Sequence, residues 1–203
     1  MTLRIEQVTT SGVFSLDGED HQVDNNIWLV GDDQQVIVVD AAHDAGPIVD
    51  AVGGREVVAI VCTHGHNDHI NAAVALAETT GGPIALHPAD RMLWDEIHPD
   101  RAPDIDLVDG MTLTVGGAGV QVLHTPGHSP GGVCLYLAEA DVVFSGDTLF
   151  NGGPGATGRS YSDLDSIVAS IRARLLTLPH DTVVHTGHGP STTIGAEVAN
   201  IPE

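Results

Sequence analysis

Lysine is absent from this 203-residue sequence, and only seven arginines stand against 28 aspartates and glutamates. The formal net charge is therefore -21 at neutral pH. Nucleic acid and anionic membrane surfaces are themselves negative, so they repel a chain of this charge. We expect neither as a partner.

Long apolar runs are also missing. No segment approaches the roughly 20 apolar residues of a membrane-spanning helix, and the opening "MTLRIEQVTTSG" lacks the basic start and apolar core of a secretory signal. These features predict a cytoplasmic location.

Cysteine and aromatic residues are scarce. Cys62 and Cys134 both lie in apolar, strand-like segments, which predicts buried and inert thiols. Trp28 and Trp94 are expected in the core or at its margin.

Apolar patterning predicts strands that alternate with single helices in each half of the chain. Continuous apolar runs at 34–42 and 56–64 are typical of buried strands, and residues 68–82 and 163–178 have the spacing of amphipathic helices. The sequence therefore predicts an α/β domain over residues 1–203, with two sheets flanked by helices.

Metal-capable side chains gather at four points where an apolar strand ends. The segments are "THGHNDH", "HTPGHSPGG", "FSGDTLF" and "HTGHGPS". Because each follows a strand, all four can meet at one edge of the sheets. The residues concerned are His64, His66, Asp68, His69, His124, His128, Asp147, His185 and His188.

The first segment offers ligands to two metals. His64 and His66 alternate by two, so both imidazoles can point one way, and Asp68 and His69 at the following helix start can face a second point. His128 would complete the first set and His188 the second, with Asp147 able to bridge. Nitrogen and oxygen donors of this kind suit two divalent ions, zinc first, with iron or manganese as alternatives.

Four other histidines lie outside these segments and are expected to be ordinary core residues: His21, His87, His98 and His180.

In these motifs the sequence resembles the metallo-β-lactamase superfamily. "HGHNDH" matches its HxHxDH signature, and "TPGHSPG", "GDTLF" and "TGHGPSTTIGAE" follow in the family's order. The resemblance implies an αββα sandwich with two mixed β-sheets. It also implies a first metal on His64, His66 and His128, a second on Asp68, His69 and His188, and Asp147 as the bridge.

Within the superfamily the sequence is most similar to glyoxalase II-like hydrolases, through "TPGHSPGG", "SGDTLF" and "GHGPSTTI". The family's C-terminal helical extension is not found after "TTIGAE", and Arg159 is followed by "SYSD" rather than closely by an acidic residue. The resemblance therefore implies thioester chemistry more firmly than it implies glutathione.

The implied reaction is hydrolysis of a small thioester or ester, in which a hydroxide shared by two metals attacks the carbonyl. Asp68 would orient this nucleophile as the catalytic residue. Arg159, Tyr161 and His43 are candidate substrate-binding residues, with a solvated loop as the alternative for the first two. Asp40 is a candidate support of the site or a loop cap.

Other functions stay open at this point. Persulfide dioxygenases share the framework but hold one iron, and lactonases use the same ligands. β-Lactamases commonly place cysteine or serine where this chain has Asp147. A non-catalytic, metal-stabilised binding module is a further alternative. The expected partner is a small molecule, a conjugate of a low-molecular-weight thiol, and a homodimer would complete the pocket in place of the extension.

Overall fold

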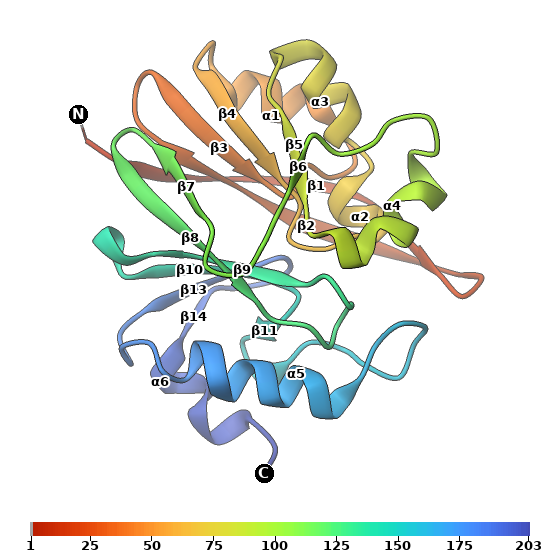
Figure 1. Cartoon of the computed structure of the whole chain (residues 1–203), viewed down its shortest axis with the longest axis vertical. Helices are drawn as coiled ribbons and strands as arrows, with labels where there is room; N and C mark the ends of the chain where they lie inside the picture. The colour runs from red at the N-terminus through yellow and green to blue at the C-terminus, as the bar shows by residue number, and fades with distance from the viewer. Residues whose placement is uncertain (1) are drawn as a thin grey trace.

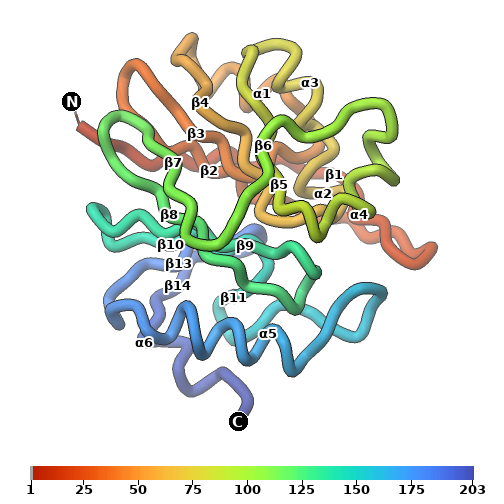
Figure 2. The backbone as a smooth tube through the Cα atoms, viewed as in Figure 1, coloured from red at the N-terminus to blue at the C-terminus, as the bar shows by residue number. Residues whose placement is uncertain are grey.

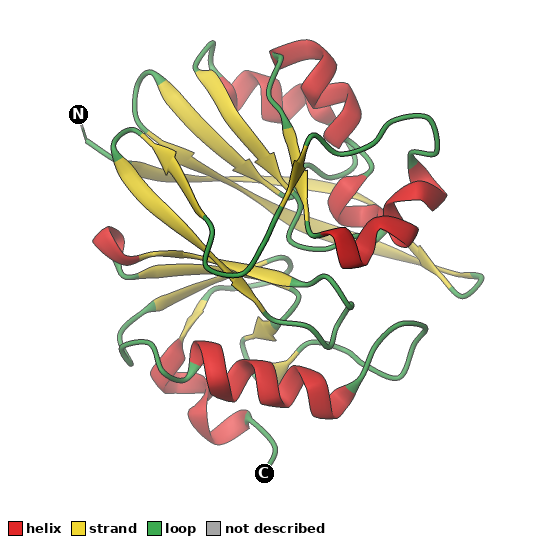
Figure 3. Cartoon of the chain, viewed as in Figure 1, coloured by secondary structure: helices red, strands yellow, loops and turns green. Residues whose placement is uncertain are grey.

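The computed structural model describes residues 2–203 and arranges them in four layers (Figure 1). Two six-stranded sheets pack face to face, and helices cover the outer face of each, as the colours of Figure 3 make clear. Both sheets mix parallel and antiparallel pairs. The predicted αββα sandwich is therefore confirmed.

The first sheet has the strand order β1-β2-β3-β4-β5-β6. Helices α1, α3 and α4 follow its strands in the chain and lie on its outer side (Figure 1). The element bounds are β1 Arg4–Leu16, β2 Glu19–Gly31, β3 Gln35–Val39, α1 Ala45–Val52, β4 Glu56–Val61, α2 Asn67–Ile70, α3 Ala73–Thr80, β5 Ile84–Leu86, α4 Arg91–Ile97 and β6 Ile105–Asp106.

The second sheet has the order β14-β13-β10-β9-β8-β7, and α5 and α6 cover it. A small hairpin of β11 and β12 lies beside it. The bounds are β7 Thr112–Val115, β8 Ala118–His124, β9 Val133–Leu137, β10 Val142–Gly146, β11 Leu149–Phe150, β12 Gly153–Pro154, α5 Leu164–Ser170, β13 Val183–Thr186, β14 Thr192–Thr193 and α6 Ile194–Glu197.

Apolar side chains fill three spaces, one between the sheets and one under each helical layer. Trp28 and Phe144 pack in the space between the sheets, and Trp94 lies under the helices of the first sheet. Cys62 and Cys134 are buried and unpaired, as predicted. This close packing holds the two sheets in a fixed relative position, so that the ends of their strands meet at one edge of the sandwich.

The hairpin of β1 and β2 is long, with thirteen residues in each strand. Its far end extends past the rest of the first sheet (Figure 2). There Asn67 joins it to α2, because the Asn67 side chain donates to the carbonyl of Val13 and accepts from the amide of Ser15. The far end of the hairpin therefore lies beside the segment that carries the histidines.

Two expectations about local structure were wrong. The single helix over 68–82 is divided into α2 and α3, because Asn71 accepts a hydrogen bond from the His43 amide and the Ala72 amide donates to Ala41. His21 and His180 are exposed rather than in the core.

No helix among residues 2–203 has both the length and the apolar character needed to span a membrane.

Candidate metal centre

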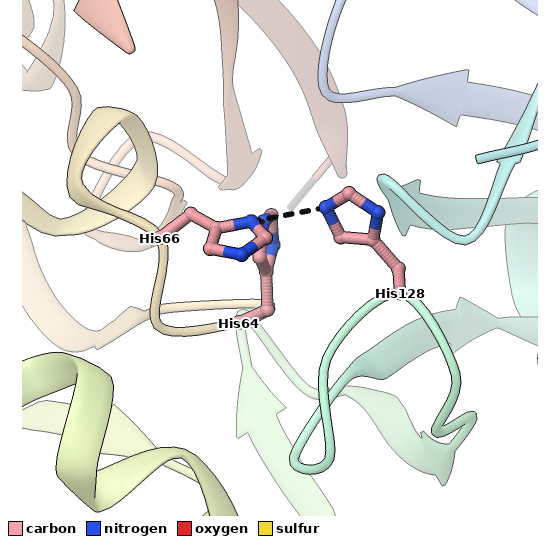
Figure 4. A group of neighbouring side chains, drawn as sticks. All are labelled: His64, His66 and His128. Atoms are coloured by element: carbon pink, nitrogen blue, oxygen red, sulfur yellow. Dashed lines mark hydrogen bonds between the residues drawn. The ribbon is translucent and has the colours of Figure 1, made fainter. Parts of the chain in front are cut away.

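The four strand ends do meet, and they bring three imidazoles together. His64 and His66 lie in the turn between β4 and α2, and His128 lies in the loop between β8 and β9. Nε2 of His64 and Nε2 of His128 each lie 3.0 Å from Nδ1 of His66. Figure 4 shows the three rings converging on one point, as expected of ligands to one ion.

A second set of donors adjoins the first. Asp68 and His69 come from α2, and His188 follows β13. Nε2 of His188 lies 3.2 Å from both Oδ2 of Asp68 and Nε2 of His69. This set supplies two nitrogens and a carboxylate within reach of one ion.

Asp147, just after β10, lies between the two sets. Its Oδ1 is 3.4 Å from Nε2 of His69, and its Oδ2 is 3.5 Å from Nε2 of His188 and 3.6 Å from Nε2 of His128. One carboxylate therefore faces ligands of both sets, which is where a bridging residue must lie.

The chemistry of this donor set fits divalent metal. Three buried atoms of this donor set have no hydrogen-bond partner within residues 2–203: Nε2 of His66, Oδ1 of Asp68 and Oδ1 of Asp147. Buried polar atoms without partners are costly, and a bound cation removes this cost for the carboxylate oxygens.

The protonation states also suit metal ligands. Burial, reinforced by neighbouring imidazoles, lowers the pKa of His64 well below its ordinary value and that of His66 to about 3. Burial raises the pKa of Asp147, but His69 and His188 outweigh it and hold the value well below normal. Neutral imidazoles and ionised carboxylates are the forms that bind metal.

His188 differs from His64 and His66 in this respect. Burial lowers its pKa, but hydrogen bonds to Asp147 and Asp68 outweigh burial and raise the pKa to about 10. The same carboxylates would attract a cation, so a metal at the second set competes with the proton of His188.

Backbone carbonyls orient the outer ligands. Nδ1 of His128 lies 2.8 Å from the carbonyl oxygen of Ala156, and Nδ1 of His188 lies 2.8 Å from that of Asp24. Each contact holds the ring so that Nε2 faces the cluster, an arrangement typical of metal-binding histidines.

Asp40, at the end of β3, supports His69. Its Oδ2 lies 3.0 Å from Nδ1 of His69, and it accepts hydrogen bonds from the amide and hydroxyl of Thr63. Thr63 precedes His64, so one buried carboxylate orders residues of both ligand sets.

Asn25 was not identified from the sequence. Its side-chain amide donates to Oδ2 of Asp68 at 3.2 Å, and its carbonyl oxygen lies 2.8 Å from Nε2 of His43. The only signal was a polar pair, "NN", directly before the apolar half of β2, "IWLVG". His43, a predicted substrate contact, therefore approaches the centre through Asn25, behind the ligands.

Asp90 was also missed. It is fully buried and accepts hydrogen bonds from the amide of Gly65, the hydroxyl of Ser129 and the amide of Gly131. Burial raises its pKa, although these three donors counteract the rise. Asp90 therefore ties the turn that carries His64 and His66 to the loop that carries His128.

A cavity of about 320 Å³ opens onto the cluster. Phe14, Leu16 and Val23 of the β1–β2 hairpin form one wall, and Ala156 and Arg159 belong to the other. Of the three predicted substrate contacts, only Arg159 lines the cavity. Tyr161 is 52% exposed and His43 is set back, so neither is part of the wall.

Comparison with known protein families shows to which superfamily the chain with this centre belongs. The sequence pattern of the Metallo-beta-lactamase superfamily matches residues 22–188, an interval that includes every predicted ligand. The chain belongs to this superfamily. The resemblance in the motifs is thereby confirmed.

Three known proteins are similar to this chain over most of its length. Hydroxyacylglutathione hydrolase GloC of Haemophilus influenzae is 32% identical over 194 residues, which cover 87% of this chain and 91% of that protein. The crystal structure of BLEG-1 B3 metallo-beta-lactamase has a TM-score of 0.80 at 31% identity, covering 95% of this chain and 98% of the other. TTHA1623 in a di-iron-bound form has a TM-score of 0.79 at 35% identity, covering 89% and 95%.

Proposed function

We propose that this protein is a metal-dependent hydrolase of a small thioester or ester, with two metals in the centre. The observation that carries the proposal is the position of Asp147 between two complete ligand sets on the floor of a cavity of about 320 Å³. A cavity of this volume is at the small end of the range for small-molecule sites.

Divalent metals, when bound, supply Lewis acidity and produce a nucleophile from water at neutral pH. His64, His66 and His128 would hold one ion, and Asp68, His69 and His188 the other, with Asp147 between them. Zinc is the metal we propose, and a di-iron neighbour makes iron the alternative to test.

Asp68 has a further role in the proposal. It lines the cavity, and its Oδ1 has no hydrogen-bond partner within residues 2–203. Burial raises its pKa, but His69 and His188 outweigh burial, so the group is ionised at neutral pH. The carboxylate can therefore orient an attacking water as well as help to hold the second ion, while Asn25 keeps Oδ2 in place.

A thioester suits this arrangement because its leaving group departs as a thiolate, which is stable at lower pH than an alkoxide and needs no general acid. The name of the relative GloC supports the same class, a thioester of a low-molecular-weight thiol. Lactones and β-lactams remain alternatives, the latter because the structural neighbour BLEG-1 is called a metallo-beta-lactamase. A dioxygenase with a single iron is a further alternative, which the presence of Asp68, His69 and His188 does not exclude.

The test is metal analysis beside a turnover panel. Protein purified without added metal is analysed for zinc and iron, then assayed with acyl thioesters, lactones, a chromogenic β-lactam and glutathione persulfide. We expect about two metals per chain and thioester cleavage, which Asp68→Ala abolishes. Asp181→Ala is the control, because Asp181 is an exposed aspartate outside the cavity. One iron per chain with oxygen consumption on the persulfide would replace this proposal by the dioxygenase.

A further inference from the structure

Arg159 is the one arginine that lines the cavity at the metal centre. It lies in the loop between β12 and α5, opposite the β1–β2 hairpin. All seven basic residues of the chain fall within the described residues 2–203, so their partners can be compared directly.

Arg159 differs from five of the other six arginines in its lack of a carboxylate partner. Five of them form ion pairs with aspartate or glutamate: Arg4, Arg55, Arg91, Arg101 and Arg174. Arg172 donates to the carbonyl of Pro202. Within residues 2–203, no ion pair of Arg159 occurs, although acidic residues outnumber arginines by 28 to 7. Its guanidinium thus has no direct carboxylate partner among the described residues, although the Asp17 carboxylate is close enough to interact with it electrostatically.

The guanidinium is nevertheless held in place. Its carbon lies 5.2 Å from the centroid of the Phe14 ring, and Nη2 lies 3.3 Å from Nε2 of His21. A cation over an aromatic face is favourable, and a guanidinium has five N–H donors, most of which these contacts leave unused.

The backbone around Arg159 is tied to the hairpin as well. The hydroxyl of Ser162 accepts hydrogen bonds from the amides of Gly158 and Arg159, and the Ser160 amide donates to Asp17 at the hairpin tip. The guanidinium is therefore positioned before any substrate arrives, which lowers the entropy cost of binding.

Phe14 links Arg159 to the metal centre. The same ring that lies under the guanidinium packs edge-on against His66, with 5.4 Å between the centroids. Leu16 and Val23 extend this apolar wall. A substrate whose carbonyl lies at the metals must cross an apolar surface to reach Arg159.

We propose that Arg159 selects substrates that carry one carboxylate, separated from the scissile carbonyl by a short apolar segment that packs on Phe14. This inference rests on the proposed hydrolase function and adds its substrate class. The guanidinium fork matches a carboxylate with two parallel hydrogen bonds. Asp24 also lines the cavity and adds negative charge, so a second anionic group is disfavoured.

The experiment compares matched charged and neutral substrates. One pair places the carboxylate on the thiol, as the acetyl thioester of 3-mercaptopropionate and its methyl ester. The other places it on the acyl group, as the glutaryl thioester of a neutral thiol and its methyl ester. For each pair, the ratio of kcat/KM for the charged over the neutral member is measured in wild type, Arg159→Gln, Arg159→Lys and Arg172→Gln.

We expect the wild type to prefer the charged member of one pair, which identifies the side that carries the carboxylate. Arg159→Gln should lower that ratio by about 10- to 100-fold, through KM rather than kcat, as loss of a charge-assisted hydrogen bond implies. Arg159→Lys should retain part of the preference because it keeps the charge, and Arg172→Gln should retain all of it. An unchanged ratio in Arg159→Gln, or no preference in either pair, would overturn the inference.

Binding separates this inference from the hydrolase proposal. Calorimetry with 3-(methylthio)propionate and its methyl ester requires no turnover. If no thioester is cleaved but the acid binds more tightly than the ester in wild type and not in Arg159→Gln, the hydrolase proposal fails and the carboxylate site stands. If thioesters are cleaved without that difference in binding or in rate, the carboxylate site fails alone.

Discussion

Oδ2 of Asp40 lies 3.0 Å from Nδ1 of His69, although the two residues belong to different elements, the end of β3 and helix α2. The contact fixes which nitrogen of His69 faces the cluster, because Nδ1 is engaged by Asp40 and Nε2 is left toward Asp68, Asp147 and His188. Carboxylates behind metal-binding histidines are known to tune affinity in this way.

Asp40→Asn is therefore expected to weaken metal binding at the set of Asp68, His69 and His188 by about 10- to 100-fold. A chelator competition titration, with zinc or cobalt, measures the affinity of each position. Asp50→Asn is the matched control, since Asp50 is an exposed aspartate on α1. Equal affinities in wild type and Asp40→Asn would mean that Asp40 only caps its loop.

Asp90→Ala is expected to lower the free energy of unfolding by about 2–4 kcal/mol, because it leaves three donors without their acceptor. Urea denaturation of the metal-free protein measures this change. Asp95→Ala, which removes an exposed ion pair with Arg91 on α4, should cost less than about 1 kcal/mol. Similar losses in the two variants would show that the three hydrogen bonds of Asp90 contribute little.

Gly187→Ala is expected to disable the centre while the fold persists. A Cβ at this position would lie 2.4 Å from Oδ1 of Asp147 and 2.8 Å from Cε1 of His69, so both must move. We expect loss of bound metal, measured by elemental analysis, with circular dichroism close to that of wild type. Gly119→Ala is the control, because its nearest neighbour is a Thr112 methyl group at 3.2 Å. Full metal content in Gly187→Ala would show that the ligands tolerate displacement.

Glu197 provides a test of pH dependence away from the metals. It is 2% exposed and accepts hydrogen bonds from Thr192, Asn200 and the amide of Gly152. Burial raises its pKa, but these hydrogen bonds outweigh burial and lower the pKa below the ordinary glutamate value. A lowered pKa in the folded state means that ionised Glu197 stabilises the protein above the ordinary pKa.

This stabilisation should disappear as the pH falls through the lowered pKa. Wild type is therefore expected to exceed Glu197→Gln in free energy of unfolding at pH 7, and the difference should shrink toward pH 3. Urea denaturation of both proteins across this range isolates Glu197 from other carboxylates, because those titrate equally in the two proteins. A difference that does not vary with pH would contradict the assignment.

Most strands and the ligand set were predictable because both depend on local spacing. A buried strand such as β4 is a continuous apolar run, and the residues directly after it must lie at the edge of the sheet. The division of the helix over 68–82 was not predictable, since it depends on hydrogen bonds from the His43 amide to Asn71 and from the Ala72 amide to Ala41, between residues about thirty positions apart.

The sequence by itself determined which side chains form the metal centre. These residues have donor side chains and directly follow apolar strands, and both features can be recognised within short segments of the sequence. The tertiary structure alone decided which residues support and surround that centre. Asn25, Asp90 and the pairing of Phe14 with Arg159 depend on contacts between distant segments, such as the 138 positions that separate His21 from Arg159. No local pattern encodes such contacts, because they arise only when packing of the two sheets brings the β1–β2 hairpin against the loop before α5.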